Sequence, residues 1–251
     1  MKDLKDPDSD GPPRLPSVRR RTEVPQNHLI SLLPQAVRRP LLESCETVEL
    51  VRGDILAEPG TETRHAWFPV DGFVSLITRL DGKPILEVGM VGREGMVGVQ
   101  LLLGVPTAPL HTLVQGSGQA LRISATALRR SLRDSPALGR IGNRYIYVLM
   151  AQFAASAACI RFHDIDQRLA RWLLMTRDRA HADEFPVTHE FLAYMLGVRR
   201  VGITTAASAL QRRHLIEYHR GELTVLDPAG LRRAACACYA DNCRSYSELL
   251  G

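Results

Sequence analysis

The residues best suited to a defined chemistry lie in one segment of this 251-residue chain, THEFLAYMLGVRRVGITTAASAL, which runs from Thr188 to Leu210. Five arginines and two acidic residues lie between positions 187 and 220, so positive charge is concentrated there. Arginine side chains bind phosphate oxygens and guanine edges, and threonine hydroxyls hydrogen-bond to bases. This composition is typical of a surface that contacts double-stranded DNA.

Two helices joined by a tight turn must position these side chains. Thr188 is a suitable N-cap for the first helix, and the small Ala193 allows a second helix to cross it closely. Gly197 tolerates the positive φ that the turn requires. Apolar residues occupy the positions where the two helices touch: Leu192, Leu196, Val198 and Ile203. The spacing predicts a helix-turn-helix whose second helix runs from about Arg199 to Gln211.

The second helix presents one face to DNA and the other to the core. The following segment HLIEYHRGELTVL predicts two short strands around Arg220-Gly221, a wing suited to phosphate contact. Arg200 is expected to read a base and Arg199 to contact a phosphate. The residues predicted at the DNA interface are Thr188, His189, Arg199, Arg200, Val201, Thr204, Thr205 and Arg220.

Between about 45 and 125 the chain consists of short apolar runs separated by Gly, Pro and Asp. This pattern predicts strands, and Asp81-Gly82 between two runs is a strong hairpin signal. The fold class that we expect is α+β: an N-terminal antiparallel β-roll of the cupin-like jelly-roll kind, a long helix, and a C-terminal winged helix-turn-helix.

The long helix is predicted over about 136–162, with Ser135 as N-cap and Pro136 at its first position. Its apolar residues recur in steps of three and four, as in a heptad pattern. Such a helix can pack on the core of its own domain, but the alanine-rich middle also allows two backbones to approach closely, and we favour dimerisation. The predicted dimer interface is Ile141, Tyr145, Val148, Gln152, Ala155, Cys159 and Phe162.

Composition restricts the setting in which the protein works. The net charge of +5 and the pI of about 9.1 are compatible with a polyanionic partner. The five cysteines do not resemble a secreted disulfide framework, which favours a reducing cytoplasm. The acidic, proline-rich N-terminus is unlike a secretory signal, and 18 consecutive apolar residues occur nowhere, so we expect neither export nor a membrane span.

The order of these elements resembles that of the Crp/Fnr family of bacterial transcription regulators, over about 28–240. The matching stretches are GDILAEPG, HAWFPVDGFVSL, EVGMVGREGMVG, QRLARWLL and the helix-turn-helix segment with its wing. The resemblance implies a homodimer that binds an inverted repeat, an N-terminal sensor domain, and RNA polymerase as a partner. The expected organisation is a disordered tail (1–26), a sensor roll (27–135), a dimerisation helix (136–163) and a DNA-binding domain with a C-terminal helix (164–251).

Two departures from the family concern the effector. Cyclic-nucleotide-binding relatives end their phosphate cassette in an Arg-Ser or Arg-Thr pair, whereas this chain has Ala108 and Pro109 there, although it keeps Glu94. Oxygen-sensing relatives carry an N-terminal cysteine cluster, whereas Cys45 is alone in this half. We therefore expect no cofactor, neither a cyclic nucleotide nor an iron–sulfur cluster, and assign only Glu94 to an effector pocket.

The sequence is compared with three other classes of function by its motifs and cysteines. The chain lacks the usual motifs of hydrolases, P-loop enzymes, zinc proteases and dinucleotide-binding enzymes, so we do not expect an enzyme. Cys236, Cys238 and Cys243 suggest a metal or redox sensor, but three thiols form no tetrahedral set without a further ligand, and no metal site is assigned. A ligand-binding module whose helix-turn-helix serves only protein contacts is the third alternative.

Overall fold

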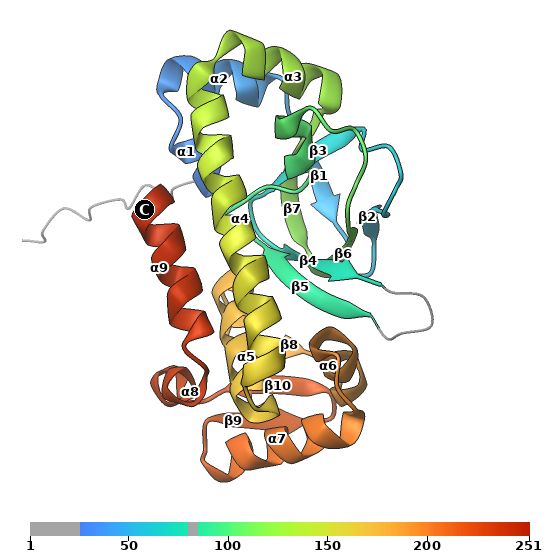
Figure 1. The fold of residues 1–251 in the computed structure, drawn as a ribbon, viewed down its shortest axis with the longest axis vertical. Helices are drawn as coiled ribbons and strands as arrows, with labels where there is room; N and C mark the ends of the chain where they lie inside the picture. The colour runs from blue at the N-terminus through green and yellow to red at the C-terminus, as the bar shows by residue number, and fades with distance from the viewer. Residues whose placement is uncertain (1–25, 80–84) are drawn as a thin grey trace, which may run out of the picture.

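The computed structural model describes residues 26–79 and 85–251. The predicted tail, apart from its last residue, and the predicted turn at Asp81-Gly82 lie outside these residues. Within them, a β-roll and a smaller helical unit are connected by one long helix, α4, which runs along the length of the molecule (Figure 1).

The roll consists of two antiparallel sheets. One has the order β1-β7-β3, and the other has the order β2-β6-β4-β5. The seven strands are β1 (Glu46–Leu50), β2 (Ile55–Ala57), β3 (His65–Pro69), β4 (Phe73–Thr78), β5 (Leu86–Val91), β6 (His111–Gly116) and β7 (Gly118–Ser124). A 3₁₀ helix, η1 (Val99–Leu103), follows β5. Strand β4 pairs with β5 on one side and β6 on the other, so the predicted antiparallel roll is confirmed.

Three short helices, which the sequence analysis did not predict, cover one end of the roll: α1 (His28–Ser31), α2 (Gln35–Glu43) and α3 (Ala125–Asp134). The side chain of Asn27 holds α1 in place. Its Oδ1 accepts a hydrogen bond from Ile30 N, and its Nδ2 donates to the carbonyl oxygens of Pro69 at 2.9 Å and Gly95 at 2.7 Å. One fully buried side chain thus caps a helix and fixes it to two loops of the roll.

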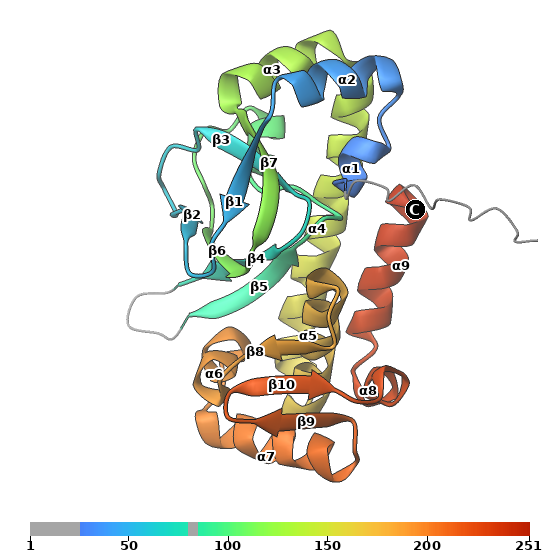
Figure 2. The same cartoon turned by 180° about the vertical axis from the view of Figure 1, so that it is seen from behind.

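Helix α4 (Pro136–Phe162) has the predicted start and length. The hydroxyl of Ser135 accepts a hydrogen bond from Leu138 N, and Pro136 occupies the first turn, where its missing N–H costs nothing. In both orientations α4 lies between the roll on one side and the C-terminal helix on the other (Figures 1 and 2).

The C-terminal unit begins with α5 (Ile165–Ala180), followed by the segments β8 (Glu184–Pro186), α6 (His189–Leu196), α7 (Arg200–Arg212), β9 (Ile216–His219) and β10 (Glu222–Val225). The three strands form a sheet with the order β8-β10-β9. Leu173, Leu192 and Ile203, from three different helices, are fully buried in one core beside this sheet. The core therefore fixes α6 and α7 relative to α5.

The end of the chain differs from the prediction of a single C-terminal helix. It forms two helices, α8 (Pro228–Ala234) and α9 (Cys238–Leu250), and α9 turns back along α4. Tyr246 Oη donates to Glu94 O at 2.8 Å, and Leu250 is buried in the core of the roll. The C-terminal helix therefore contacts both halves of the molecule (Figure 2).

Candidate DNA-binding site

Helices α6 and α7 form the predicted helix-turn-helix. Thr188 Oγ1 accepts a hydrogen bond from Phe191 N at 3.1 Å, so the predicted N-cap is present. Gly197 ends α6 in the left-handed conformation, with φ of 62°. Ala193 and Ile203 are buried where the two helices meet. The local rules used in the sequence analysis therefore account for this geometry.

The outer face of α7 is open to solvent. Arg199 is the N-cap residue of α7, and Arg200 is its first residue. Val201 is 69% exposed, and the hydroxyls of Thr204 and Thr205 donate to the carbonyl oxygens four residues earlier. Two cations thus lie at the N-terminal end of α7, where the helix dipole already places a partial positive charge. This end of the helix therefore attracts phosphate.

His189 is linked to α7 and to the wing. Its Nδ1 lies 3.1 Å from Thr204 Oγ1, and its ring stacks on that of Tyr218 in β9 with centroids 4.5 Å apart. Burial lowers the pKa of His189, and the charge of Arg200 lowers it further. The ring is therefore neutral at neutral pH, and it orients Thr204 rather than adding positive charge. Tyr218 therefore belongs with His189 and Thr204 in this set of contacts, and it was not among the residues predicted from the sequence.

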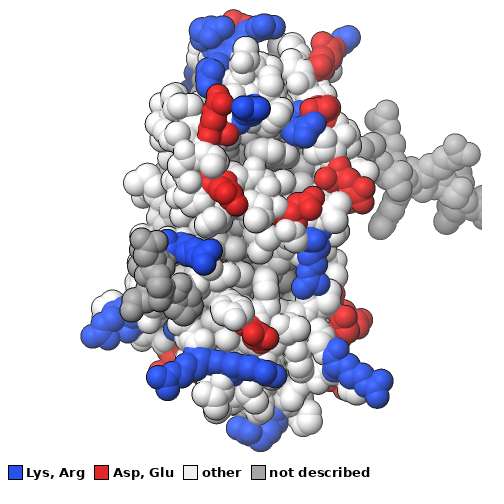
Figure 3. Space-filling model, turned by 90° about the vertical axis from the view of Figure 1, so that its right-hand side faces the viewer, with Lys and Arg blue, Asp and Glu red and all other residues white. Residues whose placement is uncertain are grey.

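The wing is a tight hairpin. Strands β9 and β10 pair from Ile216 with Val225 to His219 with Glu222. Arg220 and Gly221 form the turn with φ of 50° and 92°, as a primed hairpin turn requires. The Arg220 side chain is exposed at this tip. Figure 3 shows prominent basic side chains at the lower end of the molecule, the end at which α6 and α7 lie in Figure 1.

Gly202, a weak helix former within α7, has a packing role. A Cβ atom at this position would lie 2.8 Å from Cδ1 of Ile165, the first residue of α5. The glycine therefore permits the close approach of α5 and α7, and the position of its missing side chain faces α5.

The predicted dimer interface is partly wrong. Tyr145, Val148, Gln152 and Cys159 are buried within the same chain, and Gln152 Oε1 accepts a hydrogen bond from Met90 N at 2.7 Å. Ile141 and Ala155 are half-buried, and only Phe162 is fully exposed. The apolar stripe chosen from the sequence is the one that packs on the roll and α9, because periodicity does not distinguish an internal partner from an external one.

A second stripe of α4 remains exposed. It is offset from the buried stripe by about half a turn and consists of Asn143, Tyr147, Met150, Ala154, Ala157 and Arg161. Tyr147 and Met150 are 62% and 63% exposed. Among the described residues, α4 is also the one helix long and apolar enough by composition to cross a membrane, although a third of the relevant window is buried in the protein.

Glu94, the predicted effector residue, bridges the two halves of the protein. Its carboxylate lies 2.7 Å from Nη2 of Arg179 in α5 and accepts hydrogen bonds from Gly92 N. It lines a cavity of about 310 Å³ between the roll, α4, α5 and α9. Within residues 26–79 and 85–251, three buried polar atoms of the cavity residues have no hydrogen-bond partner: Tyr145 Oη, Arg179 Nε and Asn242 Nδ2.

A separate cavity lies inside the roll, beside Ala108 and Pro109. Its volume is about 70 Å³, and none of the residues that line it carries a charge. Trp67 and Phe153 are among its walls. Pockets that enclose small-molecule ligands measure roughly 300 Å³ or more. This cavity is smaller than that and offers no cation to a nucleotide phosphate.

Comparison with known proteins agrees with the arrangement of these elements. Residues 167–234 match the family described as the Crp-like helix-turn-helix domain. The global nitrogen regulator of Nostoc sp. (strain PCC 7120) is 23% identical over an alignment of 203 positions, which covers 77% of this chain and 89% of that protein.

Solved structures show the same fold at low identity. FixK2 from Bradyrhizobium japonicum has a TM-score of 0.66 at 12% identity, covering 77% of this chain and 98% of that one. A CRP/FNR-family transcriptional regulator from Thermus thermophilus has a TM-score of 0.63 at 21% identity, covering 76% and 98%. The expected resemblance is confirmed. The chain has the fold of the Crp/Fnr-type transcription regulators, and residues 167–234 form its Crp-like helix-turn-helix domain.

Proposed function

We propose that the protein regulates transcription as a homodimer that binds an inverted DNA repeat, with α7 of each copy in the major groove. The observation that carries the proposal is the exposed face of α7, which has Arg199 at its N-cap and Arg200 as its first residue and lies beside a wing with Arg220 at its tip. The major groove admits an α-helix, and the first residues of the second helix of such a motif reach the base edges.

The positions of the side chains suggest a division of roles. Arg200 and Thr204 lie on the exposed face of α7 and are proposed to contact bases. Arg199 precedes the helix, and Arg220 lies at the tip of the wing; both are proposed to neutralise phosphates. Thr188 and His189, at the start of α6, are proposed to face the adjacent sugar-phosphate backbone of the DNA.

The exposed stripe of α4 is proposed to meet the same stripe of a second copy. A two-fold interface brings each residue near the axis close to its own equivalent, so the patch must be self-complementary. Apolar Tyr147 and Met150 beside small Ala154 and Ala157 satisfy this condition. Two-fold symmetry then requires half-sites centred about 34 Å apart, one turn of DNA.

DNA binding can be tested with duplexes selected from a random pool by the purified protein, followed by fluorescence anisotropy at several salt concentrations. Arg200→Ala should cost about 1–3 kcal/mol and relax preference at one position per half-site. Arg199→Ala should weaken binding to all duplexes and flatten the salt dependence. The matched control is Arg129→Ala, an exposed arginine on α3 at the opposite end of the molecule (Figure 1). Equal effects of all three substitutions would contradict the proposal.

Dimerisation can be tested by sedimentation velocity of a Met150→Glu variant. Two glutamates brought together in an apolar interface should cost about 3 kcal/mol or more and produce monomers. Ile55→Glu is the control, because Ile55 in β2 is 56% exposed but distant from α4. A Met150→Glu variant that remains dimeric would show that another surface mediates assembly.

The cavity that contains Glu94 is the proposed site of effector control. A molecule bound there would contact the roll, α4, α5 and α9 together, and could therefore change how α7 is presented. The unpartnered donors of Tyr145, Arg179 and Asn242 favour an acceptor-rich ligand such as a small carboxylate. Thermal-shift screening of a set of metabolite carboxylates, with Asn242→Leu as the comparison, tests this. Shifts that are unaffected by Asn242→Leu would place the ligand elsewhere.

A further inference from the structure

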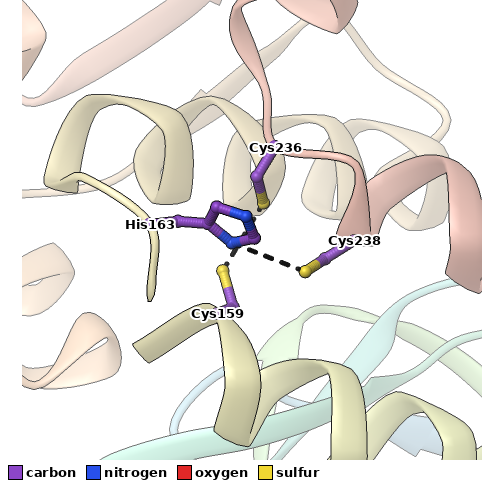
Figure 4. A group of neighbouring side chains, drawn as sticks. All are labelled: Cys159, His163, Cys236 and Cys238. Carbon is purple, nitrogen blue, oxygen red and sulfur yellow. Dashed lines mark hydrogen bonds between the residues drawn. The ribbon is translucent and has the colours of Figure 1, made fainter. Parts of the chain in front are cut away.

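Four side chains from distant parts of the chain meet where α4 ends. Cys159 and His163 come from the last turn and the C-cap of α4, Cys236 comes from the connection between α8 and α9, and Cys238 is the first residue of α9. Their side chains converge on one point (Figure 4). The three thiols are buried, and the candidate ligand atoms of all four residues lie within 4.8 Å of one another.

We propose that these residues form a mononuclear metal site of the Cys₃His type, with zinc as the ion that fits best. Zinc in structural sites takes four thiolate or imidazole ligands in a tetrahedron. Bond lengths of about 2.3 Å to sulfur and 2.0 Å to nitrogen place neighbouring ligand atoms roughly 3.6–3.8 Å apart. In the structure, Cys159 Sγ is 3.5 Å from Cys236 Sγ, and Cys238 Sγ is 3.6 Å from His163 Nδ1.

This spacing also distinguishes one ion from a cluster. The thiolates of an iron–sulfur cube bind different iron atoms and are therefore held farther apart than the ligands of a single ion. Four ligand atoms within 4.8 Å fit a single metal ion. On binding, the three thiols lose their protons to solvent, and the neutral imidazole contributes one nitrogen lone pair.

The charges around the group support the assignment independently of these distances. A divalent ion with three thiolates carries a net charge of about −1. Arg168 and Arg171 of α5 line one pocket with Cys159, and both are more than 90% buried. Arg168 donates to Leu196 O and Arg171 to Ser156 Oγ, and although Glu87 lines the same pocket, neither arginine lies within ion-pair distance of a carboxylate among the described residues. Buried cations require a nearby negative charge. A thiolate-bound ion would supply it.

The site would connect the end of α4 to the C-terminal helices. Helix α8 packs on α5, the first helix of the DNA-binding half, and α9 packs on α4. A bound ion would therefore fix the DNA-binding half relative to α4. This regulatory consequence rests on the proposed function, whereas the existence of the site does not.

The test is the metal content of the full chain, purified without an affinity tag or chelator under reducing conditions. We expect about one zinc per chain by mass spectrometry, and at least a tenfold loss in Cys236→Ser and His163→Ala. Cys243→Ser is the matched control, because Cys243 is a cysteine of α9 outside the group. Circular dichroism shows whether each variant folds.

Substitution with Co²⁺ keeps the proposal testable if a variant does not fold. The intact protein should show the intense visible absorption of a tetrahedral thiolate complex. Weak octahedral absorption, less than a tenth of an equivalent of zinc, or metal loss in Cys243→Ser equal to that in Cys236→Ser would overturn the proposal. A Cys159–Cys236 disulfide in the purified protein would also overturn the proposal if the protein still bound no zinc once that disulfide had been reduced. DNA affinity, measured separately, decides the proposed function.

Discussion

Replacing Glu87 with glutamine is expected to stabilise the protein at pH 8 much more than at pH 5. Glu87 lies in β5 and lines a small pocket together with Arg171 and Trp172 of α5. Its Oε2 is buried and has no hydrogen-bond partner in the part of the chain that the structure describes. Burial raises the pKa of Glu87 from 4.5 to about 7, and the polar side chain of Ser75 and the nearby charge of Arg171 only partly oppose this.

The magnitude follows from the difference between the folded and unfolded pKa values. A carboxyl whose folded pKa is raised binds a proton more tightly in the native state, so stability is greatest below about pH 4.5 and falls as pH rises to about 7. At about 1.4 kcal/mol per pKa unit, the raised pKa of Glu87 costs about 3 kcal/mol of stability at pH 8, where the folded carboxyl is ionised, and about 1 kcal/mol at pH 5, where it stays protonated. Glutamine resembles the neutral acid and avoids this cost.

Urea unfolding followed by tryptophan fluorescence, at fixed protein concentration, measures both values. Glu49→Gln is the matched control, because Glu49 is an exposed glutamate in another strand of the roll and should change little at either pH. A Glu87→Gln variant whose gain in stability is the same at pH 5 and pH 8 would refute the argument, since it would show that Glu87 ionises normally in the folded protein.

Three further outcomes are expected. Gly95→Ala should lower the free energy of unfolding by about 1–3 kcal/mol, because a Cβ atom there would overlap the buried Tyr145 Oη; thermal melting measures this. Gly139→Ala should raise it by up to about 1 kcal/mol in the same assay, because nothing lies within 4 Å of that Cβ position in α4. Titration calorimetry should detect no saturable binding of cyclic AMP or cyclic GMP tighter than about −7 kcal/mol, because the roll cavity lacks a cation and sufficient volume; one-per-chain binding below roughly 10 µM would contradict this.

The sequence was most informative where structure is decided locally. Thr188, Gly197 and Ser135 each satisfy a backbone group within a few residues of themselves, and the structure shows the caps and the turn where they were expected. Tyr218 was missed because its stacking on His189 depends on how the wing folds back on α6, and no sequence pattern records that contact.

The dimer interface and the cysteine group show where local patterns are insufficient. An apolar heptad stripe on α4 predicts burial but does not say whether the covering surface belongs to the same chain. Cys159 and His163 have the i, i+4 spacing of two ligands on one helical face, a signal that was available. Their partners are about 75 residues away, so only the folded chain shows that the group has four members.

The return of α9 along α4 has a consequence for how the chain folds. Tyr246 contacts His28 across 218 residues, and Leu250 is buried in the core formed mainly by the N-terminal half. During synthesis the roll and α1 leave the ribosome long before α9 exists, so their packing remains incomplete until the end of the chain arrives. Contacts of such large sequence separation slow folding and leave apolar surface transiently exposed. Fragments cut between α4 and α5 should therefore aggregate, because the N-terminal piece lacks α9, which packs on α4, and the C-terminal piece leaves the packing face of α9 uncovered.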